Sequence, residues 1–166
     1  MKQDAVRLVV EAMKEAGIGT VVTLPESKFK ELYPVLHTDP DFRYIMVTNE
    51  AEGAGIAAGC WAAGKKAVLL MENAGLRVAM EPLARLGQTH GIPVLMVMCY
   101  TGEIGERNWW GISHGQTMEP LLQAMHIPYI VVRKKDELKD AFRRASTHIS
   151  VSLYHVALIL TGEVTA

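Results

Sequence analysis

Apolar positions follow two alternating patterns along this chain. Short runs of apolar, mostly β-branched residues recur between longer stretches in which apolar residues fall every three or four positions. The short runs predict strands that are buried on both faces, and the longer stretches predict amphipathic helices that cover them. The predicted strands span residues 20–24, 44–47, 67–71, 94–99, 129–132 and 156–160.

The predicted helices cover residues 2–16, 27–36, 50–63, 75–89, 118–125 and 136–150. Ser27 is the expected N-cap of the second helix, and Pro34 predicts a kink or an early end inside it. Each connection is long enough for a right-handed crossover, which makes the strands parallel. The pattern therefore predicts a single α/β domain over residues 1–166, with three layers and a doubly wound, parallel six-stranded sheet. In such sheets ligands bind at the carboxyl edge.

Composition and charge exclude several classes of protein. Of the residues, 49% are hydrophobic, and 17 basic residues are scattered among 18 acidic ones, which is not typical of a nucleic-acid-binding protein. No apolar run approaches the roughly 18 residues of a membrane span. Cys60 and Cys99 lie among apolar neighbours and are typical of free thiols. We expect a cytoplasmic protein with no membrane or nucleic-acid partner.

One strand-to-helix junction concentrates small and acidic residues. The segment MVTNEAEGAGIAAGCWAAGKK (46–66) starts a predicted helix at Glu50 and contains several glycines. Each glycine weakens a helix by up to about 1 kcal/mol relative to alanine, a cost that tight packing would offset. From these residues alone, Glu50 and Glu52 could do no more than favour the positive end of the helix dipole.

The same segment resembles the pyrimidine-binding domain of thiamin-diphosphate enzymes. In that family a catalytic glutamate is followed nine residues later by glycine, as Glu50 is followed by Gly59. EAEGAGIAAG is similar to the matching turn in the alpha subunit of sulfopyruvate decarboxylase and in phosphonopyruvate decarboxylase. TLPESKFKEL (23–32) and LLMENAGLR (69–77) resemble further family segments in the same order. The resemblance spans roughly residues 1 to 133 and implies the same fold.

The resemblance implies how the cofactor is bound and activated. Glu50 would hydrogen-bond the pyrimidine ring of thiamin diphosphate and activate the cofactor, and its surroundings should be dry. The other implied cofactor contacts are Pro25, Asn73, Ala74 and Gly75. For Asn73, a simple helix cap is an equal alternative. Glu52 is expected to serve the helix start or an interface.

The segment CYTGEIGERNWWGISHGQ (99–116) is expected to be a loop at the mouth of the site. His114 is a candidate catalytic residue there, with a surface histidine as the alternative. Thr101 and Glu72 stand where relatives usually have arginine and glutamine. The missing arginine leaves the positive charge for an anionic substrate to Lys28, Arg77 or Arg107, with a solvated surface cation as the alternative for each. The candidate substrate contacts are Ser27, Lys28 and Arg107.

Half of the expected site is missing from the sequence. The Gly-Asp-Gly motif of a diphosphate-binding domain does not occur, and no other phosphate loop is present. We therefore expect a separate beta chain that carries this domain and holds Mg²⁺, with no metal ligands in this chain. Several alpha chains would assemble within the heteromer, and the lone chain would be inactive.

Three functions remain open on the sequence. The first is the alpha subunit of a thiamin-diphosphate-dependent decarboxylase that acts on 3-sulfopyruvate, phosphonopyruvate or another small 2-oxoacid. The second is a non-catalytic binding or regulatory subunit of the same fold. The third is an unrelated flavodoxin-like domain that binds a nucleotide or flavin, which the periodicity alone would allow.

Overall fold

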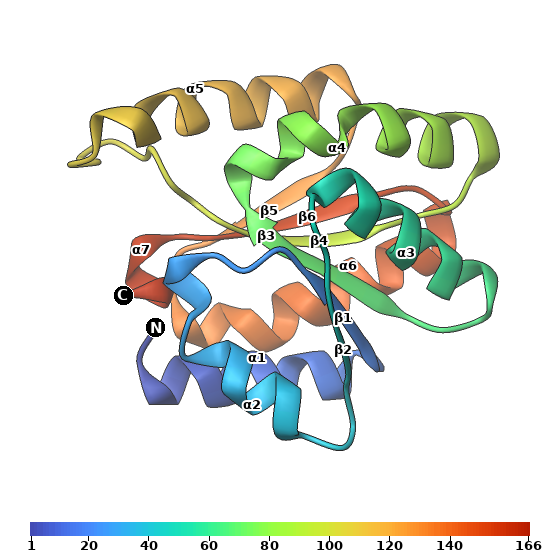
Figure 1. The fold of residues 1–166 in the computed structure, drawn as a ribbon, viewed down its shortest axis with the longest axis horizontal. Coiled ribbons are helices and arrows are strands. Elements are labelled where there is room, and N and C mark those ends of the chain that lie inside the picture. The colour runs from blue at the N-terminus through green and yellow to red at the C-terminus, as the bar shows by residue number, and fades with distance from the viewer.

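Six parallel strands form one sheet in the computed structural model, which describes residues 1–166. The strands are β1 (Thr20–Thr23), β2 (Arg43–Met46), β3 (Ala67–Glu72), β4 (Leu95–Cys99), β5 (Tyr129–Val132) and β6 (Val156–Leu160). Their order across the sheet is β2-β1-β3-β4-β6-β5 (Figure 1). The predicted parallel sheet is confirmed, and each strand lies within about one residue of its predicted bounds.

Helices cover both faces of the sheet (Figure 1). One face is covered by α1 (Gln3–Glu15), α2 (Leu32–Thr38) and α6 (Leu138–Ser152), and the other by α3 (Glu50–Ala62), α4 (Leu76–Leu83) and α5 (Trp109–Ala124). Shorter turns are η1 (Ser27–Phe29), η2 (Asn73–Gly75), the π-helical η3 (Ala84–Thr89), η4 (Lys135–Glu137) and α7 (Gly162–Thr165). None of the helices combines the length and apolar composition that crossing a membrane requires.

The sheet separates two buried cores because alternate side chains of each strand point to opposite faces. Val21 and Leu70 belong to the cluster beneath α1, α2 and α6, whereas Val22 and Leu69 belong to the cluster beneath α3, α4 and α5. Fully burying such a side chain stabilises the fold by about 1.5–3 kcal/mol. Burial on both faces explains why the strands are uninterrupted apolar runs.

The prediction for the second helix is wrong in two respects. Residues 27–29 form only one 3-10 turn, and its cap is Glu26, whose carboxylate accepts the backbone N–H of Lys28 at 2.6 Å. Helix α2 then begins at Leu32, so Pro34 lies in its first turn. Backbone N–H groups of a first turn have no partner within the helix, so proline costs nothing there and causes no kink.

The fifth helix begins at Trp109 instead of the predicted Met118. Gly111 and Gly115 lie in its first two turns and pack against Gly102, which precedes it in the chain and has a positive φ of 89°. A Cβ on Gly102 would lie 2.5 Å from the backbone nitrogen of Gly115. The glycines that made the segment look like a loop are therefore needed for close packing of the helix.

His155 joins three segments at the amino end of β6. It is fully buried, its Nδ1 accepts the N–H of Val94 at 2.9 Å, and its Nε2 lies 2.8 Å from the carbonyl oxygen of Leu83. This arrangement requires a neutral ring that carries its proton on Nε2. Gly87 of the π-helical turn lies against the ring, since a Cβ there would be 2.6 Å from Cδ2 of His155. Burial lowers the pKa of His155 below its ordinary value.

We expect the free energy of unfolding to fall as the pH drops below about 6.5, the ordinary histidine pKa. The unfolded chain then binds a proton that the folded chain excludes at His155, so protonation favours unfolding. Urea unfolding between about pH 8 and pH 5 measures this effect. The His155→Gln variant should lose about 1–3 kcal/mol of the free energy of unfolding at the higher pH, and this free energy should depend less on pH than in the wild type. If the free energy of unfolding of this variant depends on pH as strongly as that of the wild type, His155 is not the source of the pH dependence.

Candidate active site

The carboxyl ends of β1 and β3 meet where the strand order of the sheet reverses. From β1 the chain moves outward to β2 and then returns to β3 on the other side of β1. Crevices at such reversals are the usual ligand sites of open α/β sheets. Every residue that the sequence assigned to the site lies in a segment that follows β1, β2, β3 or β4, so the fold brings these segments to one edge.

The two acidic residues at the start of α3 have different contacts. Asn49 caps the helix by accepting the N–H of Glu52 at 3.0 Å. Glu52 in turn accepts bonds from the backbone N–H and the hydroxyl of Thr48, both at 2.8 Å, and these bonds lower the pKa of Glu52. Glu52 therefore completes a reciprocal cap, as expected for a helix-start residue. Glu50 takes no part in this cap and is half-buried.

The side chain of Glu50 lies directly against Gly75. A Cβ on residue 75 would lie 2.5 Å from Cγ of Glu50 and 2.6 Å from its Cδ. Atoms cannot approach this closely, so glycine at position 75 is the condition for placing the Glu50 carboxyl group there. The contact joins the start of α3 to the η2 turn after β3.

Asn73 fixes the backbone that follows β4. Its side chain is 1% exposed, its amide nitrogen donates to the carbonyl oxygen of Thr101 at 2.8 Å, and its Oδ1 accepts the N–H of Thr101 at 3.3 Å. Both ends of the amide are thus engaged within the chain. Its predicted contact with a cofactor, and that of half-buried Ala74 beside it, stay predictions.

Lys28 connects the loops after β1 and β4. Its Nζ donates to the carbonyl oxygen of Tyr100 at 3.2 Å and to the hydroxyl of Thr101 at 3.0 Å. Pro25 and Ser27 lie exposed in the same loop as Lys28, and Arg107 is exposed in the loop before α5. Of the three predicted substrate contacts, Lys28 is therefore hydrogen-bonded at the carboxyl edge of the sheet, whereas Ser27 and Arg107 lie exposed on the surface.

Glu26 lies beside the candidate residues, although the sequence pattern did not single it out. Its carboxylate accepts a hydrogen bond from the buried thiol of Cys99 at 3.5 Å. Burial and the charge of Glu26 raise the pKa of Cys99 to about 12, so the thiol stays protonated and does not act as a nucleophile. The available signal was an acidic residue directly after Pro25 in the loop that follows a buried strand.

His114 lies in the second turn of α5 and not in the predicted loop. Its Nδ1 is 3.4 Å from Oε1 of Glu72, the last residue of β3, and its ring centroid is 5.6 Å from that of Trp110. Trp109 is 83% exposed and Trp110 46% exposed, so the first of them does not pack on its own domain.

The loop between β4 and α5 is held by one carboxylate. Glu106 accepts the N–H of Gly102 at 3.2 Å and that of Asn108 at 3.0 Å. These backbone bonds lower the pKa of Glu106, so the carboxylate stays charged across the neutral range. The loop thus has a defined conformation next to the candidate residues.

The candidate residues do not line the main groove of the chain. That groove, of about 820 Å³, lies at the amino ends of β1 and β2, and its lining includes Thr20, Arg43, Ile56, Gly59 and Cys60. No three histidine, cysteine or acidic side chains come together in a way that could hold a metal ion.

Residues 3–127 match the model of a protein family described as "Thiamine pyrophosphate enzyme, N-terminal TPP binding domain". Thiamine pyrophosphate is another name for thiamin diphosphate. The match includes the segments that follow β1, β2, β3 and β4, and therefore all the candidate residues.

Curated relatives share most of the chain. The chain is 31% identical to the sulfopyruvate decarboxylase subunit alpha of Methanococcus maripaludis, with 95% of this chain and 94% of the relative covered. It is 32% identical to the subunit of the same name from Methanothermobacter thermautotrophicus, covering 85% and 86%. The phosphonopyruvate decarboxylase of Streptomyces viridochromogenes is 32% identical over 60% of this chain but only 25% of that protein.

A solved structure shares the fold. A 2-oxoglutarate:ferredoxin oxidoreductase from Magnetococcus marinus superposes with a TM-score of 0.74 over 98% of this chain and 29% of its own. The sequence identity is 16%, so this likeness supports the fold alone.

We expect the Gly75→Ala variant to lose about 1–3 kcal/mol of stability, because the new methyl group displaces the Glu50 side chain. Adding Glu50→Ala should remove most of this cost, which urea unfolding of both single variants and the double variant measures.

Gly55→Ala is the matched control, since a Cβ there meets nothing within 4 Å. It should be neutral or more stable by up to about 1 kcal/mol, because alanine favours helix. If Gly75→Ala costs the same with and without Glu50, the two residues are not in contact.

Proposed function

The chain belongs to the thiamine pyrophosphate enzyme family as an N-terminal TPP binding domain, and from this we propose that it is the alpha subunit of a two-chain 2-oxoacid decarboxylase. The proposed reaction converts 3-sulfopyruvate to sulfoacetaldehyde and carbon dioxide. This substrate is supported by the alpha subunits of sulfopyruvate decarboxylase, because this chain matches them over most of their length. The observation that carries the proposal is Glu50, which lies over Gly75 while Glu52 serves the helix cap.

The residues at the edge fit a bound thiamin diphosphate. Glu50 supplies a carboxyl group that is not engaged in the cap of its helix, and Gly75 leaves room for it. In the proposal Glu50 hydrogen-bonds the pyrimidine ring, and the other cofactor contacts come from Pro25, Asn73, Ala74 and Gly75. When bound, thiamin diphosphate supplies the electron sink for loss of carbon dioxide from a 2-oxoacid.

The substrate is proposed to lie between the β1 loop and α5. A 2-oxoacid that also carries a sulfonate has two negative charges, which favours cationic contacts. Lys28 is fixed at the edge by its bonds to Tyr100 and Thr101, and exposed Arg107 lies in the loop before α5. Ser27 would add a hydroxyl, and His114 would contact the reacting part of the substrate.

A beta subunit is proposed to complete the site. Relatives named subunit alpha match this chain over 94% and 86% of their own lengths, whereas it covers only 25% of the phosphonopyruvate decarboxylase. A diphosphate-binding domain on a second chain, holding Mg²⁺, accounts for this difference. Alpha chains would also pair within a cytoplasmic heteromer.

Phosphonopyruvate is the second candidate substrate. It is favoured by the 32% identity to the Streptomyces viridochromogenes enzyme, and its phosphonate would use the same cations. Another small 2-oxoacid would be distinguished by the same assay. The presence of Glu50, a carboxyl group that its own helix cap does not use, argues against a non-catalytic subunit of this fold.

The test is to co-express the chain with candidate beta subunits and to measure carbon dioxide release from a panel of 2-oxoacids, with and without Mg²⁺ and thiamin diphosphate. Glu50→Gln should lose at least about 10²-fold in kcat, the lower end of what a positioned acid or base contributes, with the complex still assembled. The lone chain should show no turnover.

Glu52→Gln is the matched control, because it changes the neighbouring carboxylate of the same helix turn. It should weaken the cap by about 1 kcal/mol and leave turnover within about threefold of wild type. Wild-type turnover in Glu50→Gln would remove Glu50 from its role, and turnover by the lone chain would contradict the two-chain site.

A further inference from the structure

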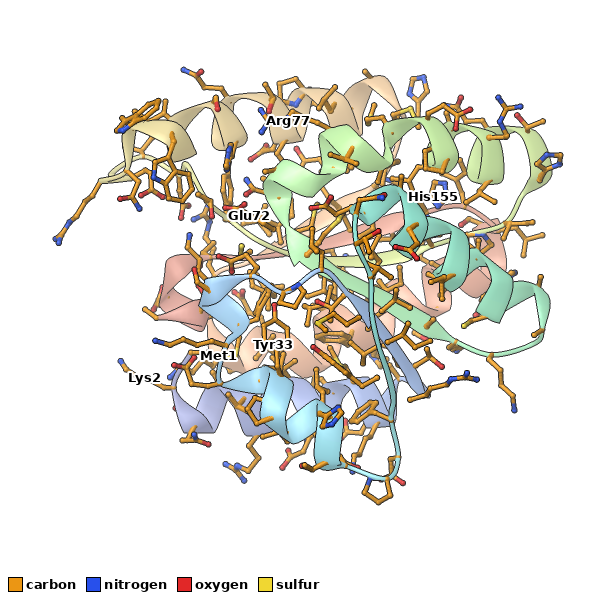
Figure 2. The ribbon with its side chains drawn as sticks, viewed as in Figure 1. Met1, Lys2, Tyr33, Glu72, Arg77 and His155 are labelled. Atoms are coloured by element: carbon orange, nitrogen blue, oxygen red, sulfur yellow. The ribbon has the colours of Figure 1, made fainter.

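Glu72 and His114 form a carboxylate–imidazole pair at the carboxyl edge of the sheet. Glu72 ends β3 and His114 lies in α5, and Nδ1 of the ring is 3.4 Å from Oε1 of the carboxylate. Both side chains are largely enclosed, with 14% of His114 and 24% of Glu72 exposed. Figure 2 shows Glu72 where the sheet meets the layer of α4 and α5, away from His155.

The two ring nitrogens of His114 have different surroundings. Nδ1 is the buried side-chain nitrogen or oxygen atom of the structure that has no aligned hydrogen bond. The ring of Trp110 packs against His114, with 5.6 Å between the ring centroids. A buried polar atom without a partner costs about 1–3 kcal/mol, and the carboxylate of Glu72 is the acceptor within reach. Nε2 is not enclosed in this way.

Glu72 has no competing donor beside it. Cys99 is its direct neighbour across the β3–β4 pairing, but the thiol of Cys99 donates to Glu26. The positive charge of Lys28 is directed to Tyr100 and Thr101. The carboxylate is therefore free to accept the Nδ1 proton of His114.

We propose that Glu72 is a positioning residue: it accepts the Nδ1 proton of His114 and so presents Nε2 to the 2-oxoacid at the carboxyl edge. The inference deepens the proposed function and rests on it. A carboxylate on one side of an imidazole fixes the tautomer and the orientation of the ring, and it stabilises the charged ring when Nε2 gains a proton.

The proposed decarboxylation requires a proton that Nε2 of His114 can deliver. A 2-oxoacid anion plus one proton gives an aldehyde plus carbon dioxide. The bond between the carboxylate carbon and the carbonyl carbon breaks, and its electron pair would be held by the electron sink that the bound cofactor supplies until the former carbonyl carbon takes up a proton. His114 delivers that proton from Nε2 and regains one from water, while Glu72 holds Nδ1–H throughout.

The first test needs no catalysis. Long-range ¹H–¹⁵N spectra of the ¹⁵N-labelled full chain report which nitrogen of neutral His114 carries the proton. We expect the Nδ1–H tautomer in the wild type and a shift toward Nε2–H in Glu72→Leu, or in Glu72→Ala if the leucine variant does not fold. Glu72→Gln should keep the Nδ1–H tautomer, because its side-chain carbonyl oxygen is also an acceptor.

Glu119→Gln is the matched control on α5. Glu119 accepts bonds from the hydroxyls of Tyr100 at 2.7 Å and Tyr129 at 2.9 Å, so the variant loosens the same helix without touching the pair. The tautomer of His114 should not change in it. A change there, or an Nε2–H tautomer in the wild type, overturns the proposal.

The second test uses the assembled enzyme. Glu72→Leu should lower kcat by at least about 10-fold, part of the 10²–10⁴ that a general acid contributes, with KM within about twofold of wild type. Glu72→Gln should restore kcat to within about threefold of wild type. An unchanged kcat in Glu72→Leu, or a loss expressed only in KM, overturns the role of the pair.

The two tests separate this inference from the proposed function. If the tautomer responds as expected but the complex decarboxylates no 2-oxoacid, the proposed function fails and the Glu72–His114 contact stands. If turnover depends on Glu50 but the tautomer ignores Glu72, only the inference about Glu72 fails.

Discussion

The contact between Glu50 and Gly75 is the constraint on which the candidate site depends. It holds a carboxyl group at the start of α3 against the turn after β3, and only a residue without a Cβ permits it. The contact joins the start of α3, which follows β2, to the η2 turn, which follows β3. Because parallel strands end at the same edge, the absence of a side chain at Gly75 leaves room for the Glu50 carboxyl group beside it.

Around this contact, the carboxylates of the edge have separate tasks. Glu52 completes the helix cap, Glu106 holds the loop before α5, and Glu26 accepts the thiol proton of Cys99. Each of these is satisfied by donors of the chain itself. Glu50 is not used in this way, and Glu72 has only His114 within reach. For these two we propose roles, Glu50 toward the cofactor and Glu72 in positioning His114. The proposed roles thus go to the carboxylates at the carboxyl edge that do not hold a helix cap, a loop or a thiol.

The loops of the edge are also tied to one another, which makes the site stiff. Asn73 engages both backbone groups of Thr101, and Lys28 reaches the same residue from the β1 loop. Sites need such support because a catalytic group that is misplaced by about 1 Å can lose much of its effect. Trp109, at the start of α5, stays exposed.

The sequence by itself determined the strands, the parallel sheet, the helix start at Glu50 and the family, because buried strands need apolar runs and the family motif is local. It could not find the true start of α5, since Gly111 and Gly115 weaken a helix unless Gly102 packs on them. Nor could it place the Glu50 side chain against Gly75 or pair Glu72 with His114. Those outcomes depend on residues that are distant in the chain and meet only when the sheet has formed, so the tertiary structure alone decided them.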